Sequence, residues 1–400
     1  MKILVGCSLP KSALHELRSL GTDVIYEPEL TAERLEKLIG DMAVLVVCRT
    51  RVSPEAIAAG KALQMILRAG TDTTNIAIDD ASSQGVFVCN CPYKDAFAVA
   101  ELTLGLLLAL DRRVLHSAAA LREGVPEEPA PTAALGLAGR TLGMMGFGPV
   151  EQEIAKRAQA FDMKLLAWSA ALTPELAAER SIEFCAWPRE LARQSDMVTI
   201  YAPPQRADEL LIDAEFLRSM RPGAYIVYVG HPAALDQEAL AEVAKERKLR
   251  VAYDISAPQL PGSDTGRFKS RLQAIPEVIG TYRLADRTQQ AYEATADEVV
   301  RVIREFLVAG NILNCVNLLE RSPAKWQLLL RLRDVVGVIA SIMAHIRDDG
   351  INAEEINSRV LLGAQAGWCV IALDERPSSE TLDAIRELDG VLHLELRALV

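Results

Sequence analysis

The chain lacks the surplus of positive charge with which proteins hold nucleic acids or anionic membranes. Its 54 acidic residues outnumber its 43 basic ones, which gives a formal net charge of −11 at pH 7. Such a chain is repelled by phosphate backbones and by anionic lipid headgroups. The composition therefore predicts that neither a nucleic acid nor a membrane is a partner.

Long hydrophobic runs are also missing. The most apolar stretch, residues 98–110, is interrupted by Glu101 and followed by Asp111, whereas a membrane-spanning helix needs about 20 apolar residues in succession. The apolar run after Lys2 stops before Pro10 and is too short for the core of a signal peptide. We therefore expect a cytoplasmic protein in which both runs are buried in folded domains.

Cysteine is scarce, and its spacing matches no metal site and no redox motif. Most of the seven cysteines fall in strand-like apolar runs, where a free thiol behaves as a small hydrophobic side chain. We expect them to pack in the core, and we predict no metal site. The seven are Cys7, Cys48, Cys89, Cys91, Cys185, Cys315 and Cys369.

A glycine turn is the first positive signal. Residues 141–148 form an apolar, strand-like run that contains Gly146 and ends in Gly148, and residues 154–161 have helical spacing. A strand, a glycine turn and a helix together let the backbone approach a pyrophosphate, which the helix N-terminus then binds through free amides. Two glycines alone are a weak signal for such a site.

Alternation of strands and helices strengthens that signal. A second short strand at residues 164–168 follows the helix, as a βαβ unit requires. Alternation of this kind predicts an α/β protein with a parallel, doubly wound sheet. Further strand-like runs occupy residues 197–200, 224–228 and 250–254, with a helical pattern over residues 236–247.

At this point the residues resemble those of the D-isomer-specific 2-hydroxyacid dehydrogenases, and most closely the long D-3-phosphoglycerate dehydrogenases among them. The resemblance extends over nearly the whole chain, and its motifs together are far more specific than any one. The matching stretches are residues 68–71, 75–76, 90–92 and 99–109, the glycine turn, residues 220–224 and 235–240, and Asp254.

The resemblance implies two Rossmann-like, doubly wound lobes. A flavodoxin-like substrate lobe would contain residues 1–97 and 287–318, and an NAD-binding lobe would contain residues 98–286. Two long helices, residues 99–121 and 288–307, would cross between the lobes, since both have a helix-like apolar pattern. The family also implies a homodimer or a higher homo-oligomer.

Residues 326–400 form a separate pattern after the boundary at residues 320–323. Strands and helices follow in the order βαββαβ, which is similar to the ferredoxin-like ACT domain that binds amino-acid effectors. Asp334, Gly337 and Asn352 match the positions where such domains hold an effector, although Val336 stands where proline is usual. The alternative is that these residues only cap a helix and form a turn.

Chemistry is where the chain departs from the family. Oxidation of a 2-hydroxy acid needs a base for the hydroxyl proton and a cation for the carboxylate, and the family uses arginine, a carboxylate and histidine. The corresponding positions here hold His231, Gln259 and Arg283. Imidazole offers no bidentate fork, glutamine carries no charge, and arginine cannot release a proton at physiological pH.

One alternative is a rearranged site in which histidine and arginine have exchanged roles. Arg283 would hold the substrate carboxylate and His231 would accept the proton. The missing carboxylate and the close geometric tolerance of catalytic groups, about 0.5 Å, argue against this arrangement.

Cofactor binding is weakened as well. Glu151 replaces the third glycine of the fingerprint and puts a carboxylate where pyrophosphate should bind, and Ser169 stands where an acidic residue would bind the ribose. We therefore predict weakened NAD binding, with Gly146, Gly148, Glu151, Ser169 and Asp254 at the cofactor site.

The resemblance also places residues at a substrate site. Arg49 and Arg51 lie where the family has basic contacts to a substrate phosphate, together with Gly70 and Thr71. Solvated loop charges are an equally good interpretation of the two arginines.

Three functions remain open. We favour a phosphoglycerate dehydrogenase-like pseudoenzyme, with a regulatory or assembly role in serine and amino-acid metabolism, that binds a small hydroxy or keto acid or an amino-acid effector without turnover. The second is an active NAD-dependent D-3-phosphoglycerate or other D-2-hydroxyacid dehydrogenase with a rearranged site. The third is an interaction scaffold that binds neither cofactor nor effector.

Overall fold

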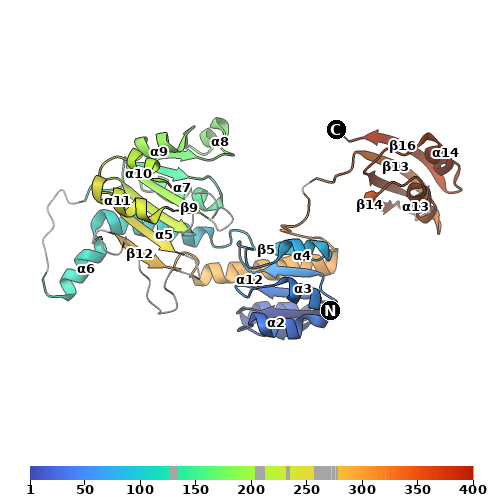
Figure 1. The fold of residues 1–400 in the computed structure, drawn as a ribbon, viewed down its shortest axis with the longest axis horizontal. Coiled ribbons are helices and arrows are strands. Elements are labelled where there is room, and N and C mark those ends of the chain that lie inside the picture. The colour runs from blue at the N-terminus through green and yellow to red at the C-terminus, as the bar shows by residue number, and fades with distance from the viewer. Residues whose placement is uncertain are drawn as a thin grey trace. The chain divides into compact units, whose positions relative to one another are not determined.

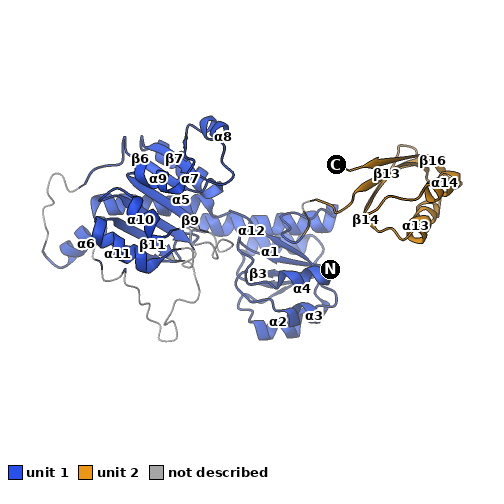
Figure 2. Cartoon of the chain, turned by 45° about the horizontal axis from the view of Figure 1, so that its top comes forward, with its two compact units in different colours: residues 1–317 blue, residues 318–400 orange. Residues whose placement is uncertain are grey.

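The structure is a computed structural model. In it the chain forms two compact units, Met1–Asn317 and Leu318–Val400 (Figure 2). It describes residues 1–125, 134–202, 212–230, 235–255, 272, 275, 278–319 and 321–399. In this part of the chain, no helix combines the length and the apolar character that a bilayer crossing requires.

The first sheet has five parallel strands in the order β2-β1-β3-β4-β5, which is the flavodoxin-like order. It lies in the blue, N-terminal part of the ribbon in Figure 1. Its central strands are apolar on both faces because helices cover both, as parallel sheets require. The strands are β1 (Lys2–Gly6), β2 (Asp23–Tyr26), β3 (Val44–Val47), β4 (Met65–Arg68) and β5 (Phe87–Asn90), and the helices between them are α1 (Lys11–Ser19), α2 (Ala32–Leu38), α3 (Pro54–Ala59) and α4 (Ile78–Ser83).

The second sheet has seven parallel strands in the order β12-β11-β10-β9-β6-β7-β8. The order reverses at β6, and ligands of such sheets bind at the carboxyl ends of the strands beside this point. The strands are β6 (Thr141–Met145), β7 (Lys164–Trp168), β8 (Glu183–Phe184), β9 (Met197–Ala202), β10 (Tyr225–Gly230), β11 (Arg250–Ile255) and β12 (Ile279–Tyr282), and the helices are α7 (Pro149–Gln159), α8 (Pro174–Glu179), α9 (Pro188–Gln194), α10 (Ala214–Ser219) and α11 (Gln237–Arg247).

Long helices link the two sheets, and one prediction about them is wrong. The sequence predicts one helix over residues 99–121, but α5 (Ala96–Arg112) ends where Arg113 adopts a left-handed conformation, with φ of 52°. A separate helix, α6 (Val114–Arg122), follows. The second long helix, α12 (Gln289–Arg304), runs on into the π-helical segment η6 (Glu305–Ala309), close to its predicted bounds.

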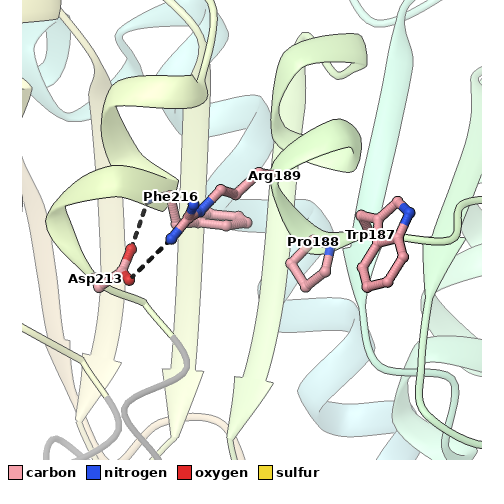
Figure 3. Close-up of a pocket in the computed structure, with 5 residues that line it drawn as sticks. All are labelled: Trp187, Pro188, Arg189, Asp213 and Phe216. Carbon is pink, nitrogen blue, oxygen red and sulfur yellow. Dashed lines mark hydrogen bonds and ion pairs between the residues drawn. The ribbon is translucent and has the colours of Figure 1, made fainter.

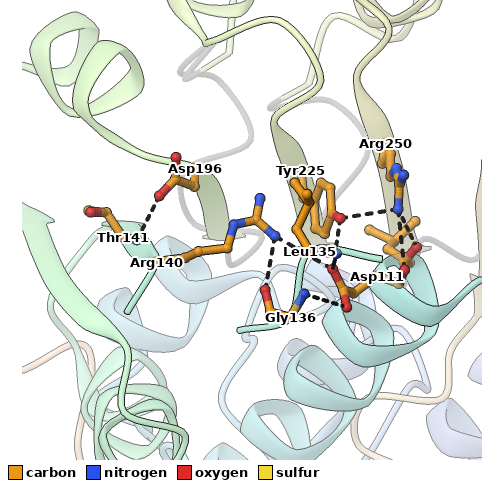
Figure 4. A network of polar contacts seen from close by, with 9 residues as sticks. Asp111, Leu135, Gly136, Arg140, Thr141, Asp196, Tyr225 and Arg250 are labelled. Atoms are coloured by element: carbon orange, nitrogen blue, oxygen red, sulfur yellow. Dashed lines mark hydrogen bonds and ion pairs between the residues drawn. The ribbon is translucent and has the colours of Figure 1, made fainter. Parts of the chain in front are cut away.

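A buried carboxylate lies at the amino ends of the strands of the second sheet (Figure 4). Asp111, 1% exposed at the end of α5, accepts hydrogen bonds from the Tyr225 hydroxyl at 2.9 Å and from the Gly136 amide at 3.1 Å. Arg140 lies 3.5 Å from the same carboxylate, and Arg250 donates to the Tyr225 hydroxyl at 3.1 Å. Both arginines also lie over the Tyr225 ring. The buried carboxylate therefore has a guanidinium, a hydroxyl and a backbone amide around it.

The end of the first unit is fixed to the first sheet. The Asn317 amide oxygen accepts from the Val88 backbone amide at 2.8 Å, and its nitrogen donates to the Val86 carbonyl at 2.9 Å. Two residues before Asn317, Cys315 forms an antiparallel β-bridge with Cys89. The chain thus returns to the first sheet immediately before the second unit begins.

The second unit has the predicted order βαββαβ. Its four strands form one antiparallel sheet in the order β14-β15-β13-β16, with both helices packed on a core that includes Leu328, Ile342 and Ile371. The elements are β13 (Trp326–Arg333), α13 (Val338–Asp348), β14 (Ala353–Val360), β15 (Ala366–Leu373), α14 (Ser379–Glu387) and β16 (Val391–Ala398).

Candidate active site and cofactor site

The glycine turn forms where the sequence predicts it, between β6 and α7. Gly146 has φ of +115°, a conformation that favours glycine, and its amide donates to the Trp168 carbonyl at 2.7 Å. Gly148 is the N-cap of α7, and Pro149 occupies the first helical position, where no amide is needed. The sequence Gly-Phe-Gly-Pro therefore stops a strand, turns the chain and starts a helix within four residues.

Glu151 fills this turn. Its side chain is 4% exposed, and its Oε2 accepts a hydrogen bond from the Gly148 amide at 2.8 Å. Its Oε1 lies 2.8 Å from the point that a Cβ on Gly146 would occupy. A carboxylate of the chain itself therefore sits over both glycines and uses an amide and the positive end of the helix dipole.

The two other predicted cofactor residues differ in their surroundings. Ser169 follows β7 and is half-buried, and its hydroxyl accepts from the Ala171 amide at 3.4 Å. Asp254, at 1% exposure, instead holds the turn after β12: it accepts from the Thr281 hydroxyl at 2.7 Å and from the amides of Leu284 and Ala285 at 3.1 and 3.2 Å. Its carboxylate thus stabilises this turn through three hydrogen bonds.

Arg283 lies in the middle of the turn that Asp254 holds. Its backbone is left-handed, with φ of 56°, and its guanidinium lies 5.8 Å from the centre of the Tyr282 ring. A non-glycine residue adopts this conformation only when neighbouring bonds support it, and the three bonds to Asp254 do so. The position of Arg283 is therefore built into the fold.

Three arginines approach one another near this turn. Burial lowers the pKa of Arg49, and the positive charges of Arg283 and Arg287 lower it further, while Asp286 opposes them. Arg287 also lies 3.6 Å from Asp286. Arg49, which follows β3 closely, and the turn before α12 therefore bring three guanidinium groups and one carboxylate together. We call these residues the arginine cluster.

The other predicted substrate residues lie near the ends of β3 and β4. Arg51 is exposed, and its charge helps to lower the pKa of Glu55, after the backbone and Ser53 hydrogen bonds to that carboxylate. Gly70 has φ of +140°, and a side chain there would overlap the Arg68 guanidinium. The Thr71 hydroxyl accepts from the Tyr93 amide at 2.8 Å. Gly70 and Thr71 therefore determine the backbone conformation just after β4.

His231 and Gln259 lie outside the described residues. Of the three residues that the resemblance assigns to the catalytic positions, the structure therefore describes Arg283. The exchange of roles between His231 and Arg283 stays a prediction.

Sequence reasoning missed two titratable groups near the cluster. Burial raises the pKa of Asp95, and the charge of Asp286 raises it further. One oxygen of Asp95 is buried and has no hydrogen-bond partner among the described residues. Burial also raises the pKa of Tyr201, which Asp95 and Asp286 raise further. Asp95 lies between the family-like stretches at residues 90–92 and 99–109. A single acidic residue before a helix does not indicate that it is buried.

Glu298 on α12 is a third group that the sequence does not single out. It is 4% exposed and receives hydrogen bonds from Arg301, at 2.6 and 2.9 Å, and from Asn314 at 2.7 Å, while Lys94 lies 3.0 Å away. These partners, with Arg301 first, lower its pKa to about 2. Glu298 therefore joins α12 to the start of α5 and to the returning chain.

The predicted effector residues of the second unit are divided between two ends of its sheet. Asp334 follows β13 and donates its amide to the Gln365 carbonyl, while Gly337 caps α13 with φ of +93°. Asn352 precedes β14 at the opposite end, where its amide donates to Asp374 at 2.9 Å. Within one copy of this unit, Asp334 and Asn352 are therefore not brought together.

A shallow hollow of about 430 Å³ lies between the starts of α9 and α10 (Figure 3). Trp187, Pro188 and Phe216 provide its apolar surface, and Arg189 forms an ion pair with Asp213 at 3.9 Å across it. The ion pair satisfies the charges that a ligand would need, and the glycine turn and the arginine cluster are not among the lining residues. We do not assign this hollow to the active site.

Comparison with known proteins agrees with this architecture. Residues 104–281 match the family model described as "D-isomer specific 2-hydroxyacid dehydrogenase, NAD binding domain". The TT0316 protein of Thermus thermophilus is structurally similar, with a TM-score of 0.68 and 28% identity, over 79% of this chain and 100% of that one. The NAD⁺-bound 3-phosphoglycerate dehydrogenase of Entamoeba histolytica shares the fold, with a TM-score of 0.63 and 22% identity over 80% of this chain and 99% of its own.

Curated relatives carry the similarity further. A D-3-phosphoglycerate dehydrogenase of Methanocaldococcus jannaschii is 30% identical over 361 residues, which cover 89% of this chain and 67% of that protein. A hydroxypyruvate reductase of Thermotoga maritima is 34% identical over 284 residues, which cover 69% of this chain and 90% of that protein. The chain therefore belongs to the D-isomer-specific 2-hydroxyacid dehydrogenase family.

Proposed function

We propose that this chain is a phosphoglycerate dehydrogenase-like protein with impaired catalysis, which binds a small anionic acid and serves a regulatory or assembly role in serine and amino-acid metabolism. A homodimer or higher homo-oligomer in the cytoplasm is the state that we infer from the family. The proposal depends mainly on one observation, the position of Arg283.

Arg283 stands where the family has its general base, and Asp254 fixes the turn that carries it. A guanidinium stays protonated throughout the physiological range, so it cannot accept the hydroxyl proton of a 2-hydroxy acid. Loss of general-base assistance alone lowers a rate by about 10²–10⁴. Burial and the charge of Asp286 raise the pKa of Asp95, but Asp95 is not at the family position.

The cofactor site supports the same conclusion. Pyrophosphate binding in this fold requires free amides at the start of α7, and the Glu151 carboxylate accepts from the Gly148 amide there. A dinucleotide would have to displace a buried carboxylate and would be repelled by its charge. The residues present therefore fit NAD poorly, and we derive no hydride-transfer step through it.

The arginine cluster suits an anionic ligand. Among the described residues, Arg49, Arg283 and Arg287 share Asp286 as a nearby carboxylate, so positive charge is in excess there. Guanidinium groups bind carboxylates and phosphates through paired hydrogen bonds. A phosphorylated keto acid such as 3-phosphohydroxypyruvate has both groups and is the ligand class that we propose.

The second unit supports the regulatory part of the proposal. Its βαββαβ order is that of the ACT domain, and Asp334 and Asn352 lie at opposite ends of its sheet. An amino-acid effector that contacted both would need residues from two copies. We therefore propose effector binding at a junction between paired domains.

Calorimetric titration with NADH, followed by stopped-flow absorbance with 3-phosphohydroxypyruvate, tests the proposal. We expect weak NADH binding, measurable 3-phosphohydroxypyruvate binding and turnover reduced by at least about 10²-fold relative to ordinary enzymes. Tight NADH binding with normal turnover would overturn it and support the rearranged site. Binding of no ligand would support the scaffold.

A variant separates the two defects. Glu151→Gly removes the competing carboxylate and should strengthen NADH binding by about tenfold or more, without restoring turnover while Arg283 is present. Glu153→Gly, on the same helix and outside the turn, serves as the control for the loss of a helical side chain. Unchanged NADH affinity in Glu151→Gly would contradict the role assigned to Glu151.

A further inference from the structure

Cys7 and Cys48 are 41 positions apart in the sequence, but they lie side by side at the carboxyl ends of two strands of the first sheet. In the parallel pair β1 and β3, Gly6 is opposite Val47, so Cys7 and Cys48 are the next residues in register. Adjacent parallel strands lie about 4.8 Å apart. Disulfides require Cα atoms about 4.4–6.8 Å apart, so this spacing permits a bond.

Both thiols point to the same face of the sheet. Cys7 belongs to the core that includes Val5 and Val46, and Cys48 packs against that core. Each cysteine directly follows its strand, at positions where the regular ladder has ended. The small backbone movement that disulfide geometry requires is therefore available without a break in the ladder.

The two thiols differ in a way that assigns their roles. Cys7 is 3% exposed, and the hydrogen bond with Cys48, together with burial, raises its pKa. Cys48 is half-buried, and the Cys7 hydrogen bond lowers its pKa to about 7, with further lowering by Arg68, Arg49 and Arg287. Cys48, whose Sγ also lies 3.9 Å from the Ala69 carbonyl oxygen, is therefore the more nucleophilic of the two thiols.

We propose that Cys7 and Cys48 form a reversible oxidation site, in which a hydroperoxide oxidises Cys48 and Cys7 then closes a disulfide. The Cys48 thiolate attacks the terminal oxygen of the hydroperoxide, the O–O bond breaks, and an alcohol leaves. The Cys7 sulfur then attacks the resulting sulfenic acid, the S–S bond forms, and water leaves. Two thiols lose two electrons and two protons, and the hydroperoxide gains them.

Cys91 is the internal comparison. It follows β5 on the same face, but β4 separates it from β3, so its distance from Cys48 is about twice the strand spacing. It is fully buried, and burial raises its pKa to about 12. Cys91 should therefore neither react quickly nor bridge to Cys48.

The first experiment maps disulfides in the full-length protein. Purified protein is treated with one equivalent of hydrogen peroxide at pH 7, alkylated, digested and analysed by mass spectrometry. We expect a linked peptide pair containing Cys7 and Cys48 that dithiothreitol removes. Oxidation of the folded protein without this pair, or preferential linkage of other cysteines, would overturn the proposal.

Variants then assign the roles. Cys7→Ser should leave a Cys48 sulfenic acid that dimedone traps, Cys48→Ser should abolish both products, and Cys91→Ser should behave as the wild type. Iodoacetamide labelling of wild-type Cys48 should follow a pH profile centred near 7, and at pH 7 should exceed that of a thiol of ordinary pKa by roughly fivefold. Labelling of Cys48 no faster than Cys185 would refute the assignment of the nucleophile.

Discussion

Buried charges are arranged differently at the amino ends and near the carboxyl ends of the strands of the seven-stranded sheet. At the amino edge, Asp111 lies among Arg140, the Tyr225 hydroxyl and two backbone amides, so the negative charge is surrounded by donors. Near the carboxyl ends, burial and the charges of Arg283 and Arg287 lower the pKa of Arg49, and Asp286 is the carboxylate that the described residues place beside them. The first arrangement stabilises the fold, and we propose that the second binds an anionic ligand.

The same contrast separates the two buried carboxylates of that sheet. Asp111 joins a helix end to the amino ends of the strands, whereas Glu151 occupies a turn that binds phosphates in relatives of this fold. Removal of Asp111 should therefore lower stability, and removal of Glu151 should change cofactor binding. This difference can be measured.

The largest expected effect is at the amino edge. Asp111→Ala leaves Arg140 and the Tyr225 hydroxyl without their buried acceptor and should lower the free energy of unfolding by about 3–5 kcal/mol. Urea denaturation followed by circular dichroism measures this change. Asp383→Ala, which removes an exposed ion pair with Arg386, is the control and should change stability by less than about 1 kcal/mol. Equal losses in both variants would remove the distinction.

The next effect depends on pH and concerns Glu298. Its pKa falls from the ordinary 4.5 to about 2 in the folded protein, so its contribution to stability is present above pH 4.5 and is lost as the pH falls toward 2. The loss should be about 2–3 kcal/mol. Urea titrations between pH 6 and pH 3 compare the wild type with Glu298→Gln, whose stability should change less with pH. Parallel curves for both proteins would show that Glu298 is not the group responsible.

The smallest effect is on ligand binding at the arginine cluster. Arg283→Ala removes one charge-assisted hydrogen-bond donor and should weaken binding of 3-phosphohydroxypyruvate by about tenfold, or about 1.4 kcal/mol. Stability should hardly change, because the variant also removes the repulsion between Arg283 and Arg49. Calorimetry compares it with Arg304→Ala, an exposed arginine paired with Glu16 on the surface. If both variants bind equally well, the cluster is not the binding site.

Much of the fold follows from local patterns in the sequence. The strand over residues 164–168 has the predicted bounds, and the glycine turn lies where Gly146 and Gly148 indicate. The helix break at Arg113 escapes prediction because apolar residues continue on both sides and no glycine or proline marks the left-handed residue. Sequence patterns predict elements well where a residue type is required and poorly where tertiary packing decides.

The candidate site divides in the same way. The sequence predicts that Glu151 competes with phosphate, and its carboxylate does lie in the turn because the spacing from Gly148 is local. The sequence also assigns Asp254 to the cofactor, but its bonds to residues 281–285 depend on pairing between β11 and β12. The nearness of Cys7 to Cys48 likewise results from strand register over a long separation. Contacts of this kind have no signature in the sequence.

The anchorage of Asn317 to the strand β5 region has a practical consequence. Because this side chain ties the last residue of the first unit to Val86 and Val88, the segment after it can be severed without unravelling the dehydrogenase-like body. A protease that cuts between residues 318 and 325 should release two intact fragments. The carboxyl-terminal unit could then be studied alone, and ligand binding assigned to one fragment or the other.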